Sequence, residues 1–110
     1  MDISFDNKKL EKYATNPRLC AQKLGDRMSD MFLYRLSQLY AAECLEDLRH
    51  VDGHYHELVG DRKGQWACDL VQPYRLIFEP TEKPIPTDGS GRSVWTEIRA
   101  VEIEEIVDYH

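Results

Sequence analysis

Residues 66–79 read WACDLVQPYRLIFE, and the alternation of side chains in this stretch decides the fold class of the chain. Apolar or aromatic residues recur at every second position around one proline, at Trp66, Cys68, Leu70, Tyr74, Leu76 and Phe78. This period of two is typical of strands with one buried face, so we expect two antiparallel strands separated at Pro73. The same alternation predicts that Arg75 projects from the opposite face of the sheet.

Upstream of this stretch, apolar residues recur at the spacing of three and four that is typical of helices. Asn16 is a good N-cap, and Pro17 suits the first helical position because the amide it lacks would be unpaired there. The apolar residues that follow are Leu24, Met28, Met31, Phe32, Leu36, Leu39 and Tyr40. We therefore expect one helix from Pro17 to about Tyr40, slightly weakened at Gly25, after a short helical segment at residues 6–13.

The last third of the chain combines a long loop with one more strand. Residues 80–93 contain three prolines and two glycines among polar residues, so we expect a loop there. Residues 94–107 are expected to form the last strand region. Its alternation changes phase near residues 104–105, which predicts a bulge or a bend.

Together these patterns predict an α+β fold with a single domain over residues 1–110. A short strand at residues 55–59 and a turn at residues 60–64 would complete a mainly antiparallel, twisted sheet. The N-terminal helices would pack on one face of this sheet. The other face would then be available for a functional site.

Composition and charge restrict the class of function. The net charge is −6, and residues 51–110 hold twelve acidic residues against six basic ones. A free-standing nucleic-acid binder is usually basic, so an RNA contact would have to rest on a local basic patch. Residues 1–12 are polar and charged, and no apolar run approaches the roughly 20 residues of a membrane span, so we expect neither a signal peptide nor a membrane segment. Three cysteines without a C-x-x-C pair favour a reducing, cytoplasmic location over a disulfide framework or a zinc ribbon.

Three basic residues are candidates for phosphate contacts. Arg62 and Lys63 lie between two glycines and close to Trp66, which suits a phosphate contact followed by a stacked base. The alternative is a solvated turn followed by a core tryptophan. Arg75 could stabilise the charge of a phosphorane-like transition state, or it could form a cross-strand ion pair with Asp69.

Histidines are the candidates for proton transfer. The chain has four of them, His50, His54, His56 and His110. Two histidines can act as general base and general acid near neutral pH. The first three could instead bind zinc or be exposed and without function. Asp108 and Tyr109 follow the last expected strand, where they could be held in place or could simply cap an edge strand.

Three blocks that occur in this order resemble one protein family. They are HELVGDRKGQW at residues 56–66, YRLIF at residues 74–78 and VDYH at residues 107–110. Together they resemble the HigB branch of the RelE toxins, also called the plasmid maintenance system killer family. The three blocks lie in the second half of the chain, whereas the N-terminal helices fit the family in pattern only.

The resemblance implies a fold, a reaction and partners. The fold is that of the small microbial ribonucleases, with N-terminal helices against a mainly antiparallel sheet. The reaction is ribosome-dependent cleavage of mRNA in the A site, in which the 2′-hydroxyl attacks the adjacent phosphate and displaces the 5′ oxygen without a metal or another cofactor. The partners are the ribosome with its mRNA and a helix-turn-helix antitoxin of the HigA type, through which alone the toxin would contact operator DNA.

The resemblance also implies the residues of the site. Those that match functional positions of the family are His56, Arg62, Lys63, Arg75, Asp108, Tyr109 and His110. We assign His56 and His110 to proton transfer and leave open which is the base. Arg75 and one of the two basic residues of the 60–64 turn would hold the phosphate, and Tyr109 would stack on the nucleotide or bond to it.

The acidic charge leaves two hypotheses open. Glu102, Glu104 and Glu105 lie on the strand that leads to His110, where they would oppose the approach of phosphate. The chain is therefore either an active mRNA interferase or a catalytically weak or inactive member that binds its antitoxin and co-represses transcription. A metal-binding module that uses the histidines is a third alternative.

Overall fold

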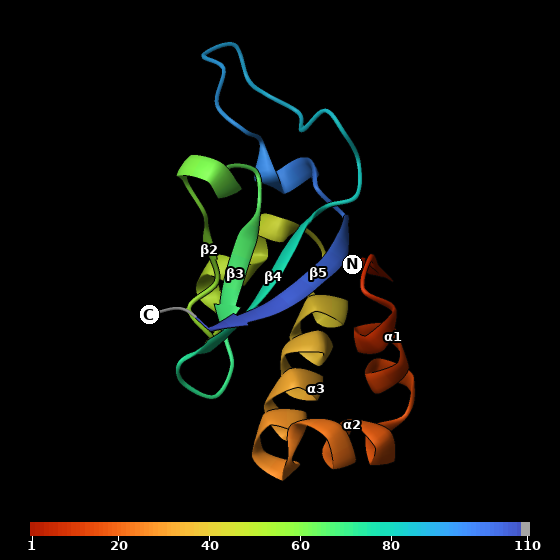
Figure 1. Ribbon diagram of the computed structural model, residues 1–110. Coiled ribbons are helices and arrows are strands. Elements are labelled where there is room, and N and C mark those ends of the chain that lie inside the picture. Colours follow the sequence, from red (N-terminus) through yellow and green to blue (C-terminus); the bar gives the residue numbers. More distant parts are fainter. Residues whose placement is uncertain (109–110) are drawn as a thin grey trace.

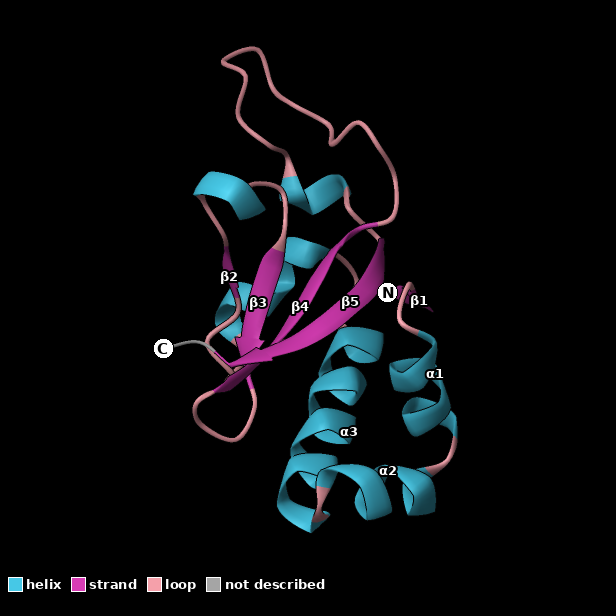
Figure 2. Ribbon diagram, in the orientation of Figure 1, coloured by secondary structure: helices cyan, strands magenta, loops and turns pink. Residues whose placement is uncertain are grey.

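The computed structural model describes residues 1–108, which form an α+β fold (Figures 1 and 2). Within these residues, the strands form one mixed five-stranded sheet in the order β1-β5-β4-β3-β2. The elements in chain order are β1 (Asp2–Phe5), α1 (Lys8–Thr15), α2 (Pro17–Leu24), α3 (Asp26–Ala41), the 3-10 helix η1 (Leu45–His50), β2 (His56–Glu57), η2 (Gly60–Arg62), β3 (Trp66–Asp69), β4 (Tyr74–Pro80), η3 (Trp95–Glu97) and β5 (Ala100–Asp108). Helices α1–α3 gather at one end of the molecule, and the long loop after β4 extends from the opposite end (Figure 1).

One strand, β1, precedes the helices, whereas β2–β5 follow them, so the expected order of helices first and strands later holds only in part. β1 pairs in parallel with β5, with Ile3 opposite Val101 and Phe5 opposite Ile103. Ile3 and Phe5 pack against the core, whereas Asp2 and Ser4 are exposed. This alternation is that of a strand with one buried face. The sheet is therefore mixed, with a parallel edge formed by the two ends of the described chain.

The amino group of Met1 connects this edge strand to the longest helix. It donates hydrogen bonds to the carbonyl oxygens of Leu39 at 3.1 Å and Tyr40 at 3.0 Å. These carbonyls belong to the last turn of α3, where the helix dipole favours a positive charge. The contact therefore helps to hold β1 at the edge of the sheet.

The single helix expected from residue 17 to residue 40 is two helices, divided at Gly25. This glycine has a φ of 84°, a left-handed conformation that a residue without Cβ adopts at little cost. Its amide donates to the carbonyl of Ala21 at 2.9 Å, and its carbonyl accepts from the amide of Ser29 at 2.9 Å. Gly25 therefore closes α2 and opens α3 instead of weakening one continuous helix.

The core lies between α3 and one face of the sheet, as the alternation predicts. Its expected helix residues Phe32, Leu36 and Leu39 are buried, and so are its expected sheet residues Trp66, Cys68, Leu70, Leu76 and Phe78. Leu24 and Met28 are partly buried beside this cluster. Tyr74 is 39% exposed, so its assignment to the core is wrong. It begins β4 directly after a turn and lies at the rim of a pocket beside Leu10 and Tyr13.

The bulge expected near residues 104–105 is confirmed. Ile77 pairs with Glu105, whereas the next residue, Phe78, pairs with Ile103, so Glu104 is the extra residue on β5. The bulge lets Ile103 and the apolar residue three positions later both face the core.

The loop expected at residues 80–93 is present between β4 and η3 (Figure 2). Its two sides meet in an isolated bridge between Thr87 and Ser93. The last strand begins at Ala100 rather than Val94, because residues 95–97 form a 3-10 helix. In the described part of the chain, no helix combines the length and the apolar character needed to cross a bilayer.

Candidate functional site

The sheet face that points away from the core carries polar and charged side chains in rows across the strands. One row is Asp69, Arg75 and Val107, and the next is His56, Ala67, Ile77 and Glu105. Ala67, Ile77 and Val107 form a small apolar cluster with Leu58, separate from the main core. We call the sheet face that carries these two rows the outer face. Within the strands, the structure therefore places His56 and Arg75, both predicted site residues, on one face and in adjacent rows.

Tyr55 is buried in the core, and its neighbours in the chain, His54 and His56, lie on the outer face. Its ring is buried against Phe78, with ring centroids 6.1 Å apart, and its hydroxyl donates to Gln38 Oε1 at 2.9 Å. Burial raises the pKa of the Tyr55 hydroxyl, which therefore remains a neutral donor. The side chains of His54 and His56 project on the other side of the chain, where their rings stack with centroids 4.3 Å apart and planes 22° apart.

Arg35 of α3 stabilises the segment that leads into β2. It is only 6% exposed, and its Nε donates to the carbonyl oxygen of Asp69 at 2.7 Å. Its Nη1 donates to Gln38 Oε1 at 3.1 Å and to the carbonyl oxygen of Asp52 at 3.4 Å. A Cβ at Gly53 would lie 2.8 Å from the same nitrogen, so this position requires glycine. One guanidinium group thus connects α3, the end of β3 and the loop that precedes β2.

The contact of His56 Nδ1 with its neighbour sets the tautomer of the neutral ring. Its Nδ1 lies 2.7 Å from the carbonyl oxygen of His54. A carbonyl oxygen only accepts hydrogen bonds, so Nδ1 carries the proton and the lone pair of the neutral ring lies on Nε2. This tautomer suits a general base that acts through Nε2.

Arg75 forms the cross-strand pair that the sequence allowed as an alternative. Its Nε lies 3.3 Å from Asp69 Oδ1, and the Nδ1 of His54 lies 3.7 Å from the same oxygen. The side chains of Arg75 and Asp69 are each 24% exposed. A phosphate that approaches Arg75 therefore meets an arginine whose charge is partly balanced by a carboxylate.

Arg62 reaches the outer face but is also paired. It donates to Glu105 Oε1 at 2.7 Å and to Gln65 Oε1 at 3.0 Å. The expected cationic pocket is thus a face on which Arg62 and Arg75 each have an acidic partner. Trp66, which the sequence offered as a base-stacking residue, is fully buried and packs edge-to-face on Trp95, with ring centroids 5.4 Å apart. The core alternative is the correct one for Trp66.

Lys63 lies at a different place from Arg75. It lines an open groove of 890 Å³ between η1 and the long loop, together with Arg49, Arg92 and Glu57. Arg49 is bound there by Glu57 at 2.7 Å. The residues that line the groove do not include His56 or Arg75, so Lys63 does not join the other predicted residues on the outer face.

The C-terminal block is described only in part. Asp108 pairs with Tyr74, one residue beyond the pair of Arg75 and Val107. Strand alternation therefore places Asp108 toward the face opposite to Arg75. Tyr109 and His110, the other two residues assigned to the site in this block, lie outside the described residues.

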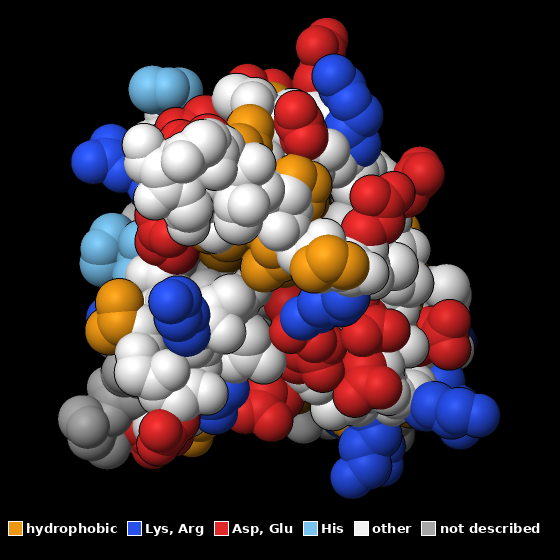
Figure 3. Space-filling view, turned by 90° about the horizontal axis from the view of Figure 1, so that it is seen from above, with side chains coloured by type: hydrophobic (Ala, Val, Ile, Leu, Met, Phe, Trp, Pro, Cys, Tyr) orange, Lys and Arg blue, Asp and Glu red, His pale blue; other side chains and the backbone are white. Residues whose placement is uncertain are grey.

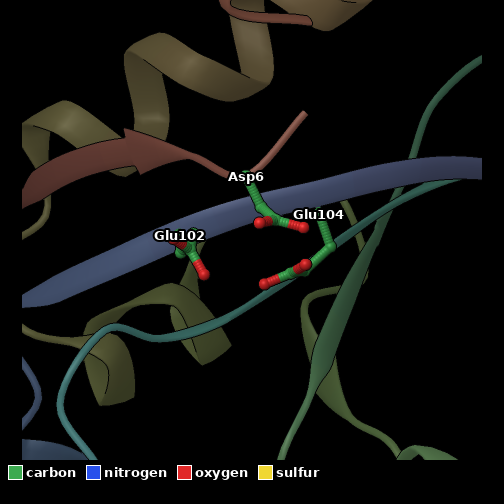
Figure 4. Close-up of side chains that lie close together, drawn as sticks. All are labelled: Asp6, Glu102 and Glu104. Carbon is green, nitrogen blue, oxygen red and sulfur yellow. The ribbon is translucent and has the colours of Figure 1, made fainter. Parts of the chain in front are cut away.

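Acidic residues gather where β1, β4 and β5 meet. Asp6 follows β1, and Glu102 and Glu104 lie on β5, each with a carboxylate oxygen within 4.8 Å of the others (Figure 4). Burial, a hydrogen bond with Glu79 and the negative charge of Glu79 raise the pKa of the Glu104 carboxyl to about 8. Burial is outweighed at Glu79 by hydrogen bonds with Glu104 and Lys83, so the pKa of Glu79 is lowered.

Acidic side chains also gather on the surface at the loop end of the molecule (Figure 3). The view from that end shows acidic side chains gathered in one patch, with basic side chains more scattered around it (Figure 3). Such a patch repels phosphate, so an RNA backbone would have to approach the site along another path.

Sequence reasoning missed part of the arrangement around His56. The sequence offered His54 as one of four candidate histidines, and it offered Asp69 only as a possible ion-pair partner of Arg75. Because His56 pairs with Ala67, counting the antiparallel register outward places residue 54 beside residue 69, a signal that depends on the position of the turn. Arg35 was missed as well, although a charged residue at helical spacing from Phe32 and Leu39 on an apolar face indicates a buried polar contact.

Comparison with known proteins adds no family assignment. No protein-family model matches the chain, and no curated protein matches it.

Proposed function

We propose that this chain is a RelE/HigB-type toxin, a ribosome-dependent endoribonuclease that cuts mRNA in the A site and is neutralised by an antitoxin. The observation that carries the proposal is His56, which lies on the outer face one row from Arg75 with Nε2 as the acceptor nitrogen of its neutral ring. The RelE-like arrangement of the helices on the sheet is part of the same proposal, which the α+β fold supports.

The reaction needs a base, a stabilised phosphate and an acid. His56 Nε2 takes the proton from the 2′-hydroxyl, and the 2′ oxygen then forms a bond to the adjacent phosphorus. The bond from phosphorus to the 5′ oxygen breaks, which leaves a 2′,3′-cyclic phosphate and a 5′-hydroxyl. Arg75 stabilises the negative charge that develops on the phosphoryl oxygens. The resemblance assigns the second proton transfer to His110.

The charge of the outer face explains why the ribosome would be required. Arg62 and Arg75 each have an acidic partner, and the chain carries a net charge of −6. Free RNA would therefore bind weakly. A ribosome that holds the mRNA in the A site would supply the alignment that the isolated protein lacks.

The proposed partner is a helix-turn-helix antitoxin of the HigA type. The acidic patch around Glu104 favours a basic contact segment on that partner, because complementary charges steer association. Co-purification from the native operon tests this pairing. A stable complex is expected, and recovery of this chain alone would contradict it.

The second candidate function is a catalytically weak or inactive protein that binds the antitoxin and co-represses transcription. The observation that favours it is the pairing of both outer-face arginines, Arg62 with Glu105 and Arg75 with Asp69. In that case the outer face would serve as a docking surface rather than an active site.

Induced expression in a bacterium separates the two functions. The wild-type chain should arrest growth, and co-expression of the neighbouring open reading frame should prevent the arrest. His56→Ala and Arg75→Ala should abolish it, whereas His50→Ala, a change at an exposed histidine of η1, should not. Arrest that persists in both outer-face variants would contradict catalysis at this site. No arrest by the wild type would favour the binding function.

A further inference from the structure

We infer that His54 is the general acid of this site and that Asp69 is the residue that positions it. The inference rests on the proposed endoribonuclease function and assigns to His54 the proton transfer that the resemblance gives to His110. It would make the stacked histidines on the outer face a complete acid–base pair.

The contacts of the two rings differ in a way that suits the two roles. His56 Nδ1 bonds to a neutral carbonyl oxygen at 2.7 Å, whereas His54 Nδ1 lies 3.7 Å from the carboxylate oxygen of Asp69. A carboxylate stabilises the positive charge of a protonated ring, and a carbonyl stabilises it less. Asp69 beside Nδ1 therefore suits His54 to donate a proton from Nε2, whereas His56, whose Nδ1 donates to a carbonyl oxygen, is suited to accept one at Nε2.

The stacking holds the two rings side by side, so that both can face one substrate. Their ring centroids are 4.3 Å apart and their planes are 22° apart. The nearest charged groups are Asp69 on β3 and Arg75 on β4, whereas Glu105 on β5 lies in the row of His56 with two strands between them. Asp69 is the group that contacts His54 directly, and Arg75 contacts the same carboxylate oxygen.

The backbone holds His54 in this position at a cost. Its φ of 54° is left-handed, a conformation that residues other than glycine rarely adopt. Such outliers gather at functional sites, where the surrounding structure enforces them. Here the enforcing contacts are those of Arg35, which bonds to the carbonyl oxygens of Asp52 and Asp69 on either side of the segment.

The exposure of His54 allows it to reach a substrate. Its side chain is 60% exposed, compared with 24% for Asp69. Nδ1 lies 3.7 Å from the carboxylate, which leaves Nε2, on the other side of the ring, to donate the proton. His56 Nε2 takes the proton of the 2′-hydroxyl as the new bond to phosphorus forms, and His54 Nε2 gives its proton to the 5′ oxygen as the bond from phosphorus to that oxygen breaks. Exchange with solvent then restores both rings.

A substrate whose leaving group needs no proton tests this role. Programmed ribosomes would carry mRNA with either oxygen or sulfur at the bridging 5′ position of the cleavage site, and single-turnover cleavage would be measured. With oxygen, His54→Asn should lower the rate by about 100-fold or more, the usual contribution of an acid. With sulfur, which leaves as a thiolate, the variant should approach the wild-type rate. Asparagine tolerates the left-handed backbone, and His50→Asn is the matched control.

The outcomes separate this inference from the function on which it rests. His56→Ala should remain slow on both substrates, because a thiolate leaving group does not replace the base. Wild-type rates for His54→Asn on the oxygen substrate, or a sulfur rescue seen for His110→Ala instead, would overturn the role of His54 alone. A defect in His54→Asn that is equal on both substrates would show a structural role and would also overturn it. No cleavage by the wild type would overturn the proposed function itself.

Discussion

Glu104→Gln should make the protein more stable at alkaline pH, although it removes a charged group from a strand. Glu104 is the extra residue of the β5 bulge, where Glu79 bonds to it and Asp6 and Glu102 lie close. Burial and these neighbours raise the pKa of Glu104 from 4.5 to about 8. Glutamine has the shape of the protonated acid and carries no charge to repel its neighbours.

The size of the effect follows from the pKa. Between about pH 4.5 and about pH 8 the folded protein holds a proton on Glu104 that the unfolded chain releases. The free energy of unfolding therefore falls as the pH rises through this window. The carboxyl group is partly exposed and its titration is linked to that of Glu79, so solvent screening reduces the full shift, and we expect a fall of about 1–2 kcal/mol.

Urea unfolding at several pH values measures this difference. At pH 5 the wild type and Glu104→Gln should have similar free energies of unfolding, and at pH 8.5 the variant should be more stable by about 1–2 kcal/mol. Glu82→Gln removes the same charge from the exposed loop and should leave the pH dependence of the wild type unchanged. An equal fall with pH in Glu104→Gln and the wild type would refute this account of the acidic cluster.

Three further changes test the core, the support of the site and its charge. Leu36→Ala should lower the free energy of unfolding by about 2–5 kcal/mol, because the side chain is buried between α3 and the sheet, and an unchanged urea midpoint would contradict this packing. Arg35→Lys should lower the free energy of unfolding by about 2–4 kcal/mol, because one ammonium group cannot replace the hydrogen bonds to both Asp69 and Gln38. A near-normal free energy of unfolding would show that the two-branched guanidinium group is not needed. Glu105→Gln should release Arg62 and tighten binding to ribosomes in a filter assay, whereas unchanged or weaker binding would argue against a phosphate role for that arginine.

The sequence predicted the local elements of the second half well. The alternation around Pro73 placed Leu76 in the core and Arg75 on the outer face, and the change of phase near residue 104 predicted the bulge. These features depend on neighbouring residues only. Gly25 was harder to interpret, because a glycine can weaken a helix or divide it, and the outcome depends on how the two segments pack.

Non-local features could not be predicted in the same way. β1 has only four residues, and its partner β5 lies at the other end of the chain, so the alternation of Ile3 and Phe5 was too short a signal. The acidic cluster forms only because that pairing brings Asp6 beside Glu104. The contact of His54 with the carboxylate likewise depends on the register of β2 and β3.

The measurement that tests the central claim most directly is cleavage of mRNA on programmed ribosomes by the wild type, His56→Ala and Arg75→Ala. The wild type should cut the mRNA in the A site and leave a 2′,3′-cyclic phosphate, with little cleavage of the same RNA in solution. Each variant should cut about 100- to 10,000-fold more slowly, through loss of the base in one case and of charge stabilisation in the other. Wild-type cleavage that survives both changes, or no cleavage by the wild type, would contradict an endoribonuclease site on the outer face.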